Sequence, residues 1–311
     1  MHGFKRLTIV ALSLWASGAL VSAAVPWDAV EAGRASIETI QPVGDLAKRT
    51  AKSPKILLVG SSPVVLGLSA KRIESATGLP TFNLGVFGAL TFFPEYLEKV
   101  EALVQPGDIV VVSNPNWIHS LDAKLPTGCI SSFRLACLRW RPRPMPHLIE
   151  VIRVLSGRLA VDPGVVRDGA GDAVVVRSAN TAATIPPLPF DGSISDEASA
   201  EVRQTVEVLR AKGACPVIAL GPILVDPRER EKWLKEQSAT EARIAKLGLA
   251  NATISEGLVN TDRGLFLDTY EHPAASERAA WTDRVIQRLV SKYQSPCAGS
   301  MAKAVVSGQP S

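Results

Sequence analysis

Short apolar runs alternate with amphipathic segments along most of this chain. The runs 55–60 and 108–113 are largely apolar and rich in branched residues, without the polar alternation of a half-exposed strand. Such runs are typical of strands that are buried on both faces of a sheet. Weaker strands are predicted at 80–84, 216–220 and 264–267.

Segments with helical periodicity separate these strands. They are predicted at residues 70–77, 93–104, 196–212, 228–247 and 274–293. Strands and helices in alternation build a mainly parallel sheet with helices on both faces, so the sequence predicts a three-layer, doubly wound α/β fold. Ligands of such sheets bind at the carboxyl ends of the strands. The loops that follow the strands are therefore the candidate site.

The alternation fails between residues 118 and 193. Pro and Gly residues are frequent there, Cys129 and Cys137 lie close together, and only 147–159 is predicted to be helical. We interpret 118–193 as an insertion in a single domain. It forms either a lid or substrate-binding excursion over the sheet or a poorly ordered elaboration, and composition is compatible with both.

The first residues have the three-part pattern of a secretory signal. Lys5 and Arg6 precede an apolar run over 7–21, and small residues follow at 22–24. We predict a signal peptide at 1–24, with an uncleaved membrane anchor as the alternative because the run approaches the length of a span. The remaining chain divides into an N-terminal segment (25–54), an α/β domain (55–293, with the insertion) and a C-terminal tail (294–311). The predicted location is the bacterial periplasm or the outside of the cell.

Charge and cysteine content narrow the functional classes. The formal net charge is +4, and no Lys/Arg cluster is interleaved with aromatic residues, so nucleic-acid binding is not predicted. Four cysteines in an exported chain permit disulfides. Among the possible pairings we favour Cys129 with Cys137 and Cys215 with Cys297. No CxxC-like pair stands with histidine partners, so no metal site is predicted.

Polar and small residues follow the predicted strands at one end of the sheet. They are Gly60-Ser61-Ser62 after the first strand, Gly88 in the segment 83–89, Asn116 in the segment 114–117, and Asp268 with His272 near the last helix. Each feature alone has an ordinary structural explanation, namely a helix N-cap, a turn, an Asx turn or a surface histidine.

Together these residue types suit nucleophilic catalysis. A serine at the start of a helix lies where backbone N–H groups can stabilise a developing oxyanion. Serine is a weak nucleophile near neutral pH, and a histidine held by a carboxylate is the general base that activates it. Asn116 adds an amide donor, and Gly88 lets the backbone approach a ligand closely.

The order Ser, Gly, Asn and then Asp with His resembles the SGNH/GDSL hydrolase superfamily over most of the mature chain. Particularly similar are its periplasmic, polysaccharide-associated members, whose first block reads much like residues 58–62 followed by Gly67-Leu68-Ser69. The resemblance implies a flavodoxin-like sheet with Ser62 as the nucleophile, His272 as the base and Asp268 as the residue that orients it.

The resemblance also implies an oxyanion hole made by the N–H groups of Ser62 and Gly88 and by the side chain of Asn116. Three positions differ from the family pattern. Ser61 replaces the usual Asp, the third block has Pro115 and Trp117 in place of Gly-x-Asn-Asp, and one extra residue separates Asp268 from His272. Glu271 is a rival carboxylate, although adjacent side chains rarely meet.

The function implied by the resemblance is that of an exported serine esterase. It would remove O-acyl groups, with acetyl as the expected group, from a cell-envelope or extracellular polysaccharide. An acylated glycan or small ester would be its partner, with no metal or organic cofactor and no membrane contact beyond an uncleaved anchor. Two alternatives stay open: O-acyl transfer to a sugar, and a catalytically inactive module that binds a glycan or a partner protein. The sequence leaves the oligomeric state undefined.

Overall fold

The computed structural model describes residues 42–48, 54–86, 93–113, 165–176, 187–188, 190, 196–249, 253–267 and 269–290. The predicted signal peptide, the predicted helix at 147–159 and the C-terminal tail lie outside these ranges and stay predictions. Within these ranges, no helix is long and apolar enough to cross a membrane.

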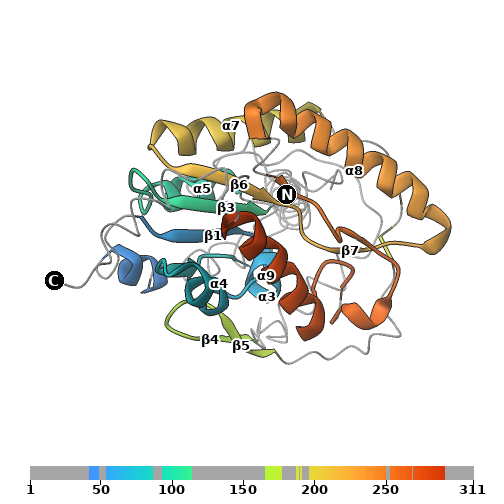
Figure 1. Ribbon diagram of the computed structural model, residues 1–311, viewed down its shortest axis with the longest axis horizontal. Coiled ribbons are helices and arrows are strands. Elements are labelled where there is room, and N and C mark those ends of the chain that lie inside the picture. Colours follow the sequence, from blue (N-terminus) through green and yellow to red (C-terminus); the bar gives the residue numbers. More distant parts are fainter. Residues whose placement is uncertain are drawn as a thin grey trace, which may run out of the picture.

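A parallel sheet forms the centre of the molecule (Figure 1). Its described strands are β1 (Ile56–Gly60), β2 (Thr81–Asn83), β3 (Ile109–Ser113), β6 (Cys215–Ala219) and β8 (Thr253–Ile254), in the spatial order β2-β1-β3-β6-β8. Counted along the chain, this is the 2-1-3-4-5 order of flavodoxin-like sheets. The order reverses between β1 and β3, and sheets of this kind bind ligands at the carboxyl ends of the strands at that point.

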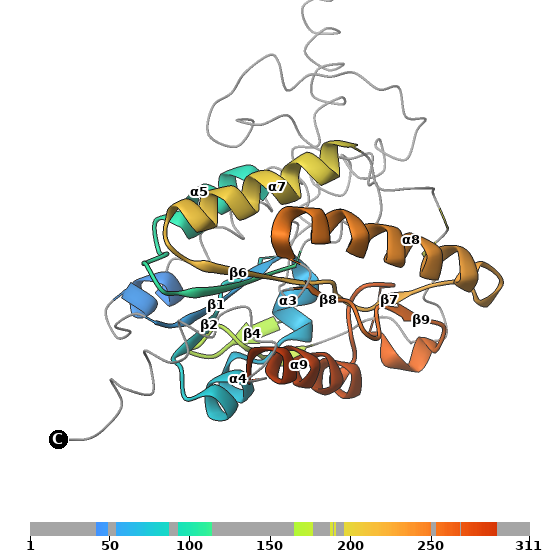
Figure 2. The same cartoon turned by 45° about the horizontal axis from the view of Figure 1, so that its top comes forward.

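Helices cover both faces of the sheet (Figure 2). One face carries α3 (Ser62–Gly67), α4 (Ala70–Thr77) and α9 (Ala275–Val290), and the other carries α5 (Phe93–Glu101), α7 (Asp196–Ala211) and α8 (Arg230–Ile244). Successive side chains of β1 alternate between the two cores, because a strand has a period of two. Ile56 and Leu58 pack on the α4/α9 side, whereas Leu57 and Val59 pack on the α5/α7 side. The predicted three-layer α/β architecture is confirmed.

Glycines end two helices where the sequence predicted. Gly78 follows α4 in a left-handed conformation (φ 71°), and its N–H donates to the carbonyl of Glu74. α8 begins after a 3-10 turn, η5 (Pro227–Glu229), and continues into η6 (Ala245–Leu249), where Gly248 has φ 72°. Both positions need a positive φ, which favours glycine. The glycines in the sequence were therefore enough to predict where these two helices end.

The predicted strand at 264–267 is wrong. Arg263–Leu265 form a 3-10 turn, η8, because the Asp262 carboxylate accepts a hydrogen bond from the Gly264 N–H (2.8 Å) and caps it. The last strand of the sheet is instead β8, which pairs with the end of β6. A strand of two residues is too short to leave a periodic signal in the sequence.

Part of the predicted insertion belongs to the folded domain. β4 (Val165–Arg167) and β5 (Ala173–Val176) form an antiparallel hairpin that composition did not reveal. The Asn83 N–H donates to the carbonyl of Ala170 in the turn of this hairpin (2.8 Å). A side chain at Gly171 would come within 2.1 Å of the Asn83 carbonyl, so only glycine permits this approach. For this segment, the prediction of a poorly ordered elaboration is wrong.

The same hairpin helps to fix the start of α4, the helix that the sequence predicted at residues 70–77. The Asp172 carboxylate accepts hydrogen bonds from the N–H groups of Ala70 (2.7 Å) and Lys71 (3.0 Å) and from the Ser69 hydroxyl (2.9 Å). These are the unpaired donors of a helix start, and an aspartate satisfies them well. A distant carboxylate therefore helps to fix the start of α4 at Ala70.

Smaller elements complete the domain. β7 (Ile223–Leu224) pairs in parallel with β9 (Val259–Asn260) beside the main sheet. Residues 42–48 are helical, and Ala47 is fully buried in the core on the α5/α7 side. Part of the predicted N-terminal segment therefore packs against the folded domain.

A disulfide ties the start of β6 to another part of the chain. Cys215 is disulfide-bonded, and Cys129, Cys137 and Cys297 all lie outside the described ranges. The presence of a disulfide is therefore confirmed for Cys215. Its pairing with Cys297 stays a prediction.

Candidate active site

Ser62 lies where β1 ends, at the reversal point of the strand order. Gly60 pairs with Ser113 at the end of β3, and a side chain at Gly60 would come within 2.0 Å of the Ser113 carbonyl. The backbone of Gly60 (φ 151°) is also one that other residues rarely adopt, so this sharp exit from the strand requires glycine. The chain then passes through Ser61 and enters α3 at Ser62, which is 7% exposed.

Ser61 holds the N-cap position of α3 without forming a cap. Its hydroxyl makes no cap hydrogen bond, and among the described residues its buried oxygen has no partner, although the residue is only 1% exposed. A buried hydroxyl without a partner is unfavourable. The simple N-cap explanation therefore does not apply to Ser61.

Tyr96 of α5 fixes the backbone beneath the two serines. The Gly60 N–H donates to the Tyr96 phenol oxygen (3.1 Å), and the Tyr96 hydroxyl donates to the carbonyl of Leu84 (2.7 Å). Complete burial raises the pKa of the phenol well above its ordinary value, so the hydroxyl stays protonated. One side chain thus joins the end of β1 to the segment that follows β2.

Asn83, the first residue of the second sequence block, holds α3 in place. Its side-chain amide donates to the carbonyls of Val64 (3.1 Å) and Leu68 (3.2 Å), and its oxygen accepts from the Gly85 N–H (3.0 Å). Asn83 is fully buried, so these bonds satisfy an otherwise costly polar group. The described part of this block positions the helix that begins with Ser62.

Two predicted oxyanion donors are not placed. Gly88 and Asn116 lie outside the described residues, and so does Asp268. Their predicted roles stay predictions. Of the five predicted site residues, the structure describes Ser62 and His272.

His272 lies in a short closed loop between η8 and α9. The Leu267 N–H donates to the His272 carbonyl (2.8 Å), and the Ala274 N–H donates to the Leu265 carbonyl (2.8 Å), which closes the loop at its base. The Leu224 N–H of β7 donates to the carbonyl of Tyr270 (2.7 Å), which attaches the loop to β7. This loop does not follow a strand of the main sheet, so that part of the prediction is wrong.

The loop packs directly against α3. A side chain at Gly67, the last residue of α3, would come within 2.7 Å of the Pro273 ring and 2.5 Å of the Trp281 ring. Leu267, at the other end of the loop, packs against the buried cluster that contains residues of α3. Ser62 and His272 are far apart in sequence, yet α3 and the loop that contains His272 are in contact.

Glu271 is a buried carboxylate directly before His272. It is 9% exposed, and its Oε2 has no hydrogen-bond partner among the described residues. Burial raises the pKa of this carboxyl, while the positive charge of His272 lowers it by a smaller amount. Only burial, which sequence does not show, distinguishes Glu271 from a surface glutamate.

Arg167 of β4 is a cation that sequence reasoning missed. Burial lowers the pKa of its guanidinium, and its Nη1 has no hydrogen-bond partner in the described part of the chain. Because Arg167 belongs to the insertion, where no pattern was evident, no sequence signal connected it with the serines.

No protein-family model matches the chain, and no curated protein matches it. Among the described residues, no group of three or more His, Cys, Asp or Glu side chains could hold a metal ion.

Proposed function

We propose that this protein is an exported SGNH-type serine esterase that removes O-acyl groups, chiefly acetyl, from a cell-envelope or extracellular polysaccharide. One observation carries the proposal. Ser62 begins α3 at the reversal point of the sheet, and the loop that contains His272 packs against that same helix. The proposed nucleophile and base, from distant parts of the sequence, are thus carried by contacting elements, which supports a role as a pair in acyl transfer.

In the proposed reaction, the Ser62 oxygen forms a bond to the carbonyl carbon of the ester while His272 accepts the hydroxyl proton. The tetrahedral intermediate collapses, the C–O bond to the sugar breaks, and His272 returns the proton to the departing sugar oxygen. Water then attacks the acyl-enzyme and loses a proton to His272. The bond between the acyl carbon and the Ser62 oxygen breaks, His272 returns the proton to that oxygen, and the carboxylic acid is released. N–H groups near Ser62, with Gly88 and Asn116, are the proposed oxyanion donors.

A carboxylate that stabilises the protonated imidazole completes the proposed machinery. Asp268 has this role by family resemblance. Glu271 is the alternative, because it interacts with His272 and its buried Oε2 has no partner among the described residues. Asp268→Asn and Glu271→Gln variants distinguish the two carboxylates. Substitution of the one that acts should lower kcat strongly and change KM little.

Hydrolysis of p-nitrophenyl acetate by the mature protein tests the proposal. Ser62→Ala and His272→Ala should each lower kcat/KM by about a thousandfold or more, because nucleophile and base act as a unit. Ser238→Ala is the matched control, since Ser238 is an exposed serine on α8 whose hydroxyl bonds only within its own helix. Equal inertness of the parent and both variants on short acyl esters would contradict an esterase.

Acyl transfer is distinguished in the same assay by adding an acceptor sugar. Release of acetate without the acceptor supports hydrolysis. Turnover that appears only with the acceptor would identify the activity as O-acyl transfer instead of hydrolysis. In that case a sugar hydroxyl, and not water, attacks the acyl-enzyme.

A further inference from the structure

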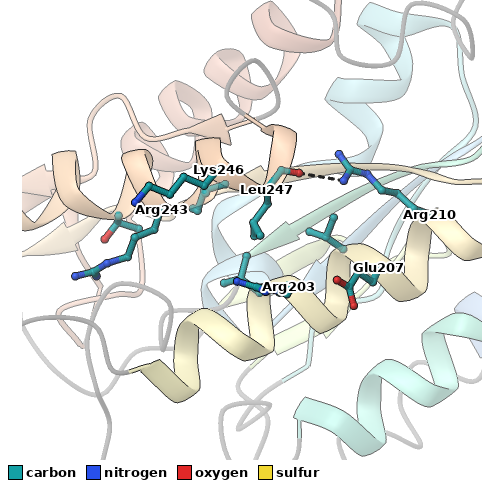
Figure 3. Close-up of a pocket in the computed structure, with 10 residues that line it drawn as sticks. Arg203, Glu207, Arg210, Arg243, Lys246 and Leu247 are labelled. Carbon is teal, nitrogen blue, oxygen red and sulfur yellow. Dashed lines mark hydrogen bonds between the residues drawn. The ribbon is translucent and has the colours of Figure 1, made fainter.

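A groove of about 400 Å³ lies between α7 and the carboxyl-terminal end of α8 (Figure 3). Its floor is apolar and consists of Val202, Val206, Ile244 and Leu247, which belong to or pack against the core on that side of the sheet. This volume falls within the range of small-molecule sites. The groove lies in the helical layer over the α5/α7 side, and it shares no lining residue with the proposed active site.

Positive charge gathers around this apolar floor. The lining contains Arg203, Arg210, Arg243 and Lys246 but a single carboxylate, Glu207. Figure 3 shows these side chains around the groove, with Arg203 and Arg210 from α7 and with Arg243 and Lys246 from the end of α8 and η6. Like charges gathered around one groove repel each other, which favours an incoming anion.

The four cations are only partly neutralised. Arg243 forms an ion pair with Glu236 (3.2 Å). Arg210 donates to the carbonyls of Leu247 (3.0 Å) and Gly248 (3.3 Å), which joins the two walls but does not cancel its charge. No carboxylate in the described ranges pairs with Arg203 or Lys246. With Glu207 and Glu236 counted against the four cations, a surplus of two positive charges remains.

Helix dipoles do not explain this cluster completely. Arg210 and Arg243 lie in the last turns of their helices, where a cation is favourable in any protein. Arg203 lies in the middle of α7, so the dipole gives no reason for it. Thr240 supplies an independent observation. It lines the groove, is 2% exposed, and its hydroxyl has no partner among the described residues. A buried donor of this kind is stabilised by an acceptor that enters the groove.

We propose that the groove binds a phosphate-bearing compound. A phosphate monoester carries about −1.5 to −2 charges at neutral pH, which matches the surplus of two. Its three terminal oxygens offer more acceptors to the cations of the groove and to the Thr240 hydroxyl than the two oxygens of a carboxylate. The organic part of the ligand covers the apolar floor. This inference does not depend on the proposed esterase activity.

Calorimetric titration of the full-length protein with sodium pyrophosphate tests the site. Arg203→Gln combined with Lys246→Gln should weaken binding at least about tenfold, because two charge-assisted hydrogen bonds are lost. Thr240→Val, which keeps the shape and removes the hydroxyl, should weaken it by about tenfold as well. Absence of a titration signal in the parent, or parental affinity in either variant, overturns the proposal.

A matched charge control is available in the same chain. Lys99→Gln combined with Lys235→Gln removes two exposed lysines outside the groove and should leave the affinity unchanged. A loss equal to that of Arg203→Gln/Lys246→Gln would show general charge attraction and overturn the site. Phosphatidylcholine vesicles containing phosphatidic acid identify the source of the phosphate. Sedimentation with them that requires Arg203 and Lys246 indicates a lipid headgroup, and pyrophosphate binding without sedimentation indicates a soluble phosphate ester.

Discussion

The two ends of the central sheet treat buried polar groups in opposite ways. At the amino end, Lys55 and Asp108 form an ion pair (2.7 Å) in which both side chains are 0% exposed. The Asp108 carboxylate also accepts from the N–H groups of Lys55 (3.2 Å) and Gln105 (2.7 Å). The charged pair and the backbone around it are therefore satisfied within the protein, as buried charges must be.

At the carboxyl end, several buried polar atoms have no partner among the described residues. They are the Ser61 hydroxyl, the Oε2 of Glu271 and, close by, the Nη1 of Arg167. Groups of this kind cost free energy unless something else satisfies them. The comparison indicates that the amino end is built for stability, while the carboxyl end keeps polar atoms available for a substrate, water or ligand.

The largest expected effect is at the amino end. Asp108→Asn removes the charge that balances Lys55 and leaves an ammonium buried without a counterion. We expect a loss of about 3–5 kcal/mol in the free energy of unfolding, measured by urea denaturation. Adding Lys55→Met should recover much of this loss, because the uncompensated charge disappears while the substituted amide oxygen can still accept a backbone hydrogen bond.

An exposed ion pair is the control for this prediction. Arg72 and Asp283 are also 2.7 Å apart, but their side chains are 50% and 41% exposed. Arg72→Ala should therefore change stability by no more than about 1 kcal/mol. If Asp108→Asn costs no more than Arg72→Ala, the contrast between the two ends does not hold.

A smaller, pH-dependent effect is expected at Glu271. Its folded-state pKa is raised above the ordinary 4.5 because burial disfavours the carboxylate. Its contribution to stability is therefore complete below pH 4.5 and is lost as the pH rises through the raised value. Glu271→Gln does not titrate, so its stability relative to the parent should increase across this window.

Urea denaturation of the parent and of Glu271→Gln at a series of pH values measures the difference in their free energies of unfolding. Other groups that titrate in both proteins contribute equally and cancel in this difference. A difference that is independent of pH would mean that Glu271 titrates normally in the folded state. The activity of the same variant also reports whether Glu271 supports His272.

The smallest expected effect is at Ser61. Ser61→Ala removes a buried hydroxyl that has no partner among the described residues, so unfolding free energy should change by no more than about 0.5 kcal/mol. Esterase activity should persist, in contrast to Ser62→Ala. A stability loss above about 1 kcal/mol in thermal or urea unfolding would indicate that the hydroxyl has a structural role.

Several elements were predictable because local chemistry decides them. β1 and β3 are continuous apolar runs, and a backbone buried on both faces requires such a sequence. α4 ends at Gly78 because the left-handed conformation there favours glycine. Ser62 could be assigned to the end of β1 for the same reason, since the loop that follows a strong strand is known once the strand is known.

Other features follow from contacts between distant segments, and no local pattern encodes them. β8 forms because it pairs with the end of β6, and the Asp172 carboxylate, far away in the sequence, adds to the local Ser69 cap at the start of α4. The predicted strand at 264–267 failed for a local reason, because Asp262 caps a 3-10 turn there. Glu271 and Arg167 matter only because they are buried.

By itself, the sequence determined the class of the fold and the position of a serine at the end of the first strand. The spacing of apolar residues and the glycines at helix ends are local properties of the sequence. They are enough to predict most strands and helices and their order along the chain. Only the tertiary structure decided that the His272 loop packs on α3, that Lys55 and Asp108 are buried together, and that α7 and α8 enclose a cationic groove. These arrangements depend on burial and on contacts between residues far apart in the chain, which have no local signature.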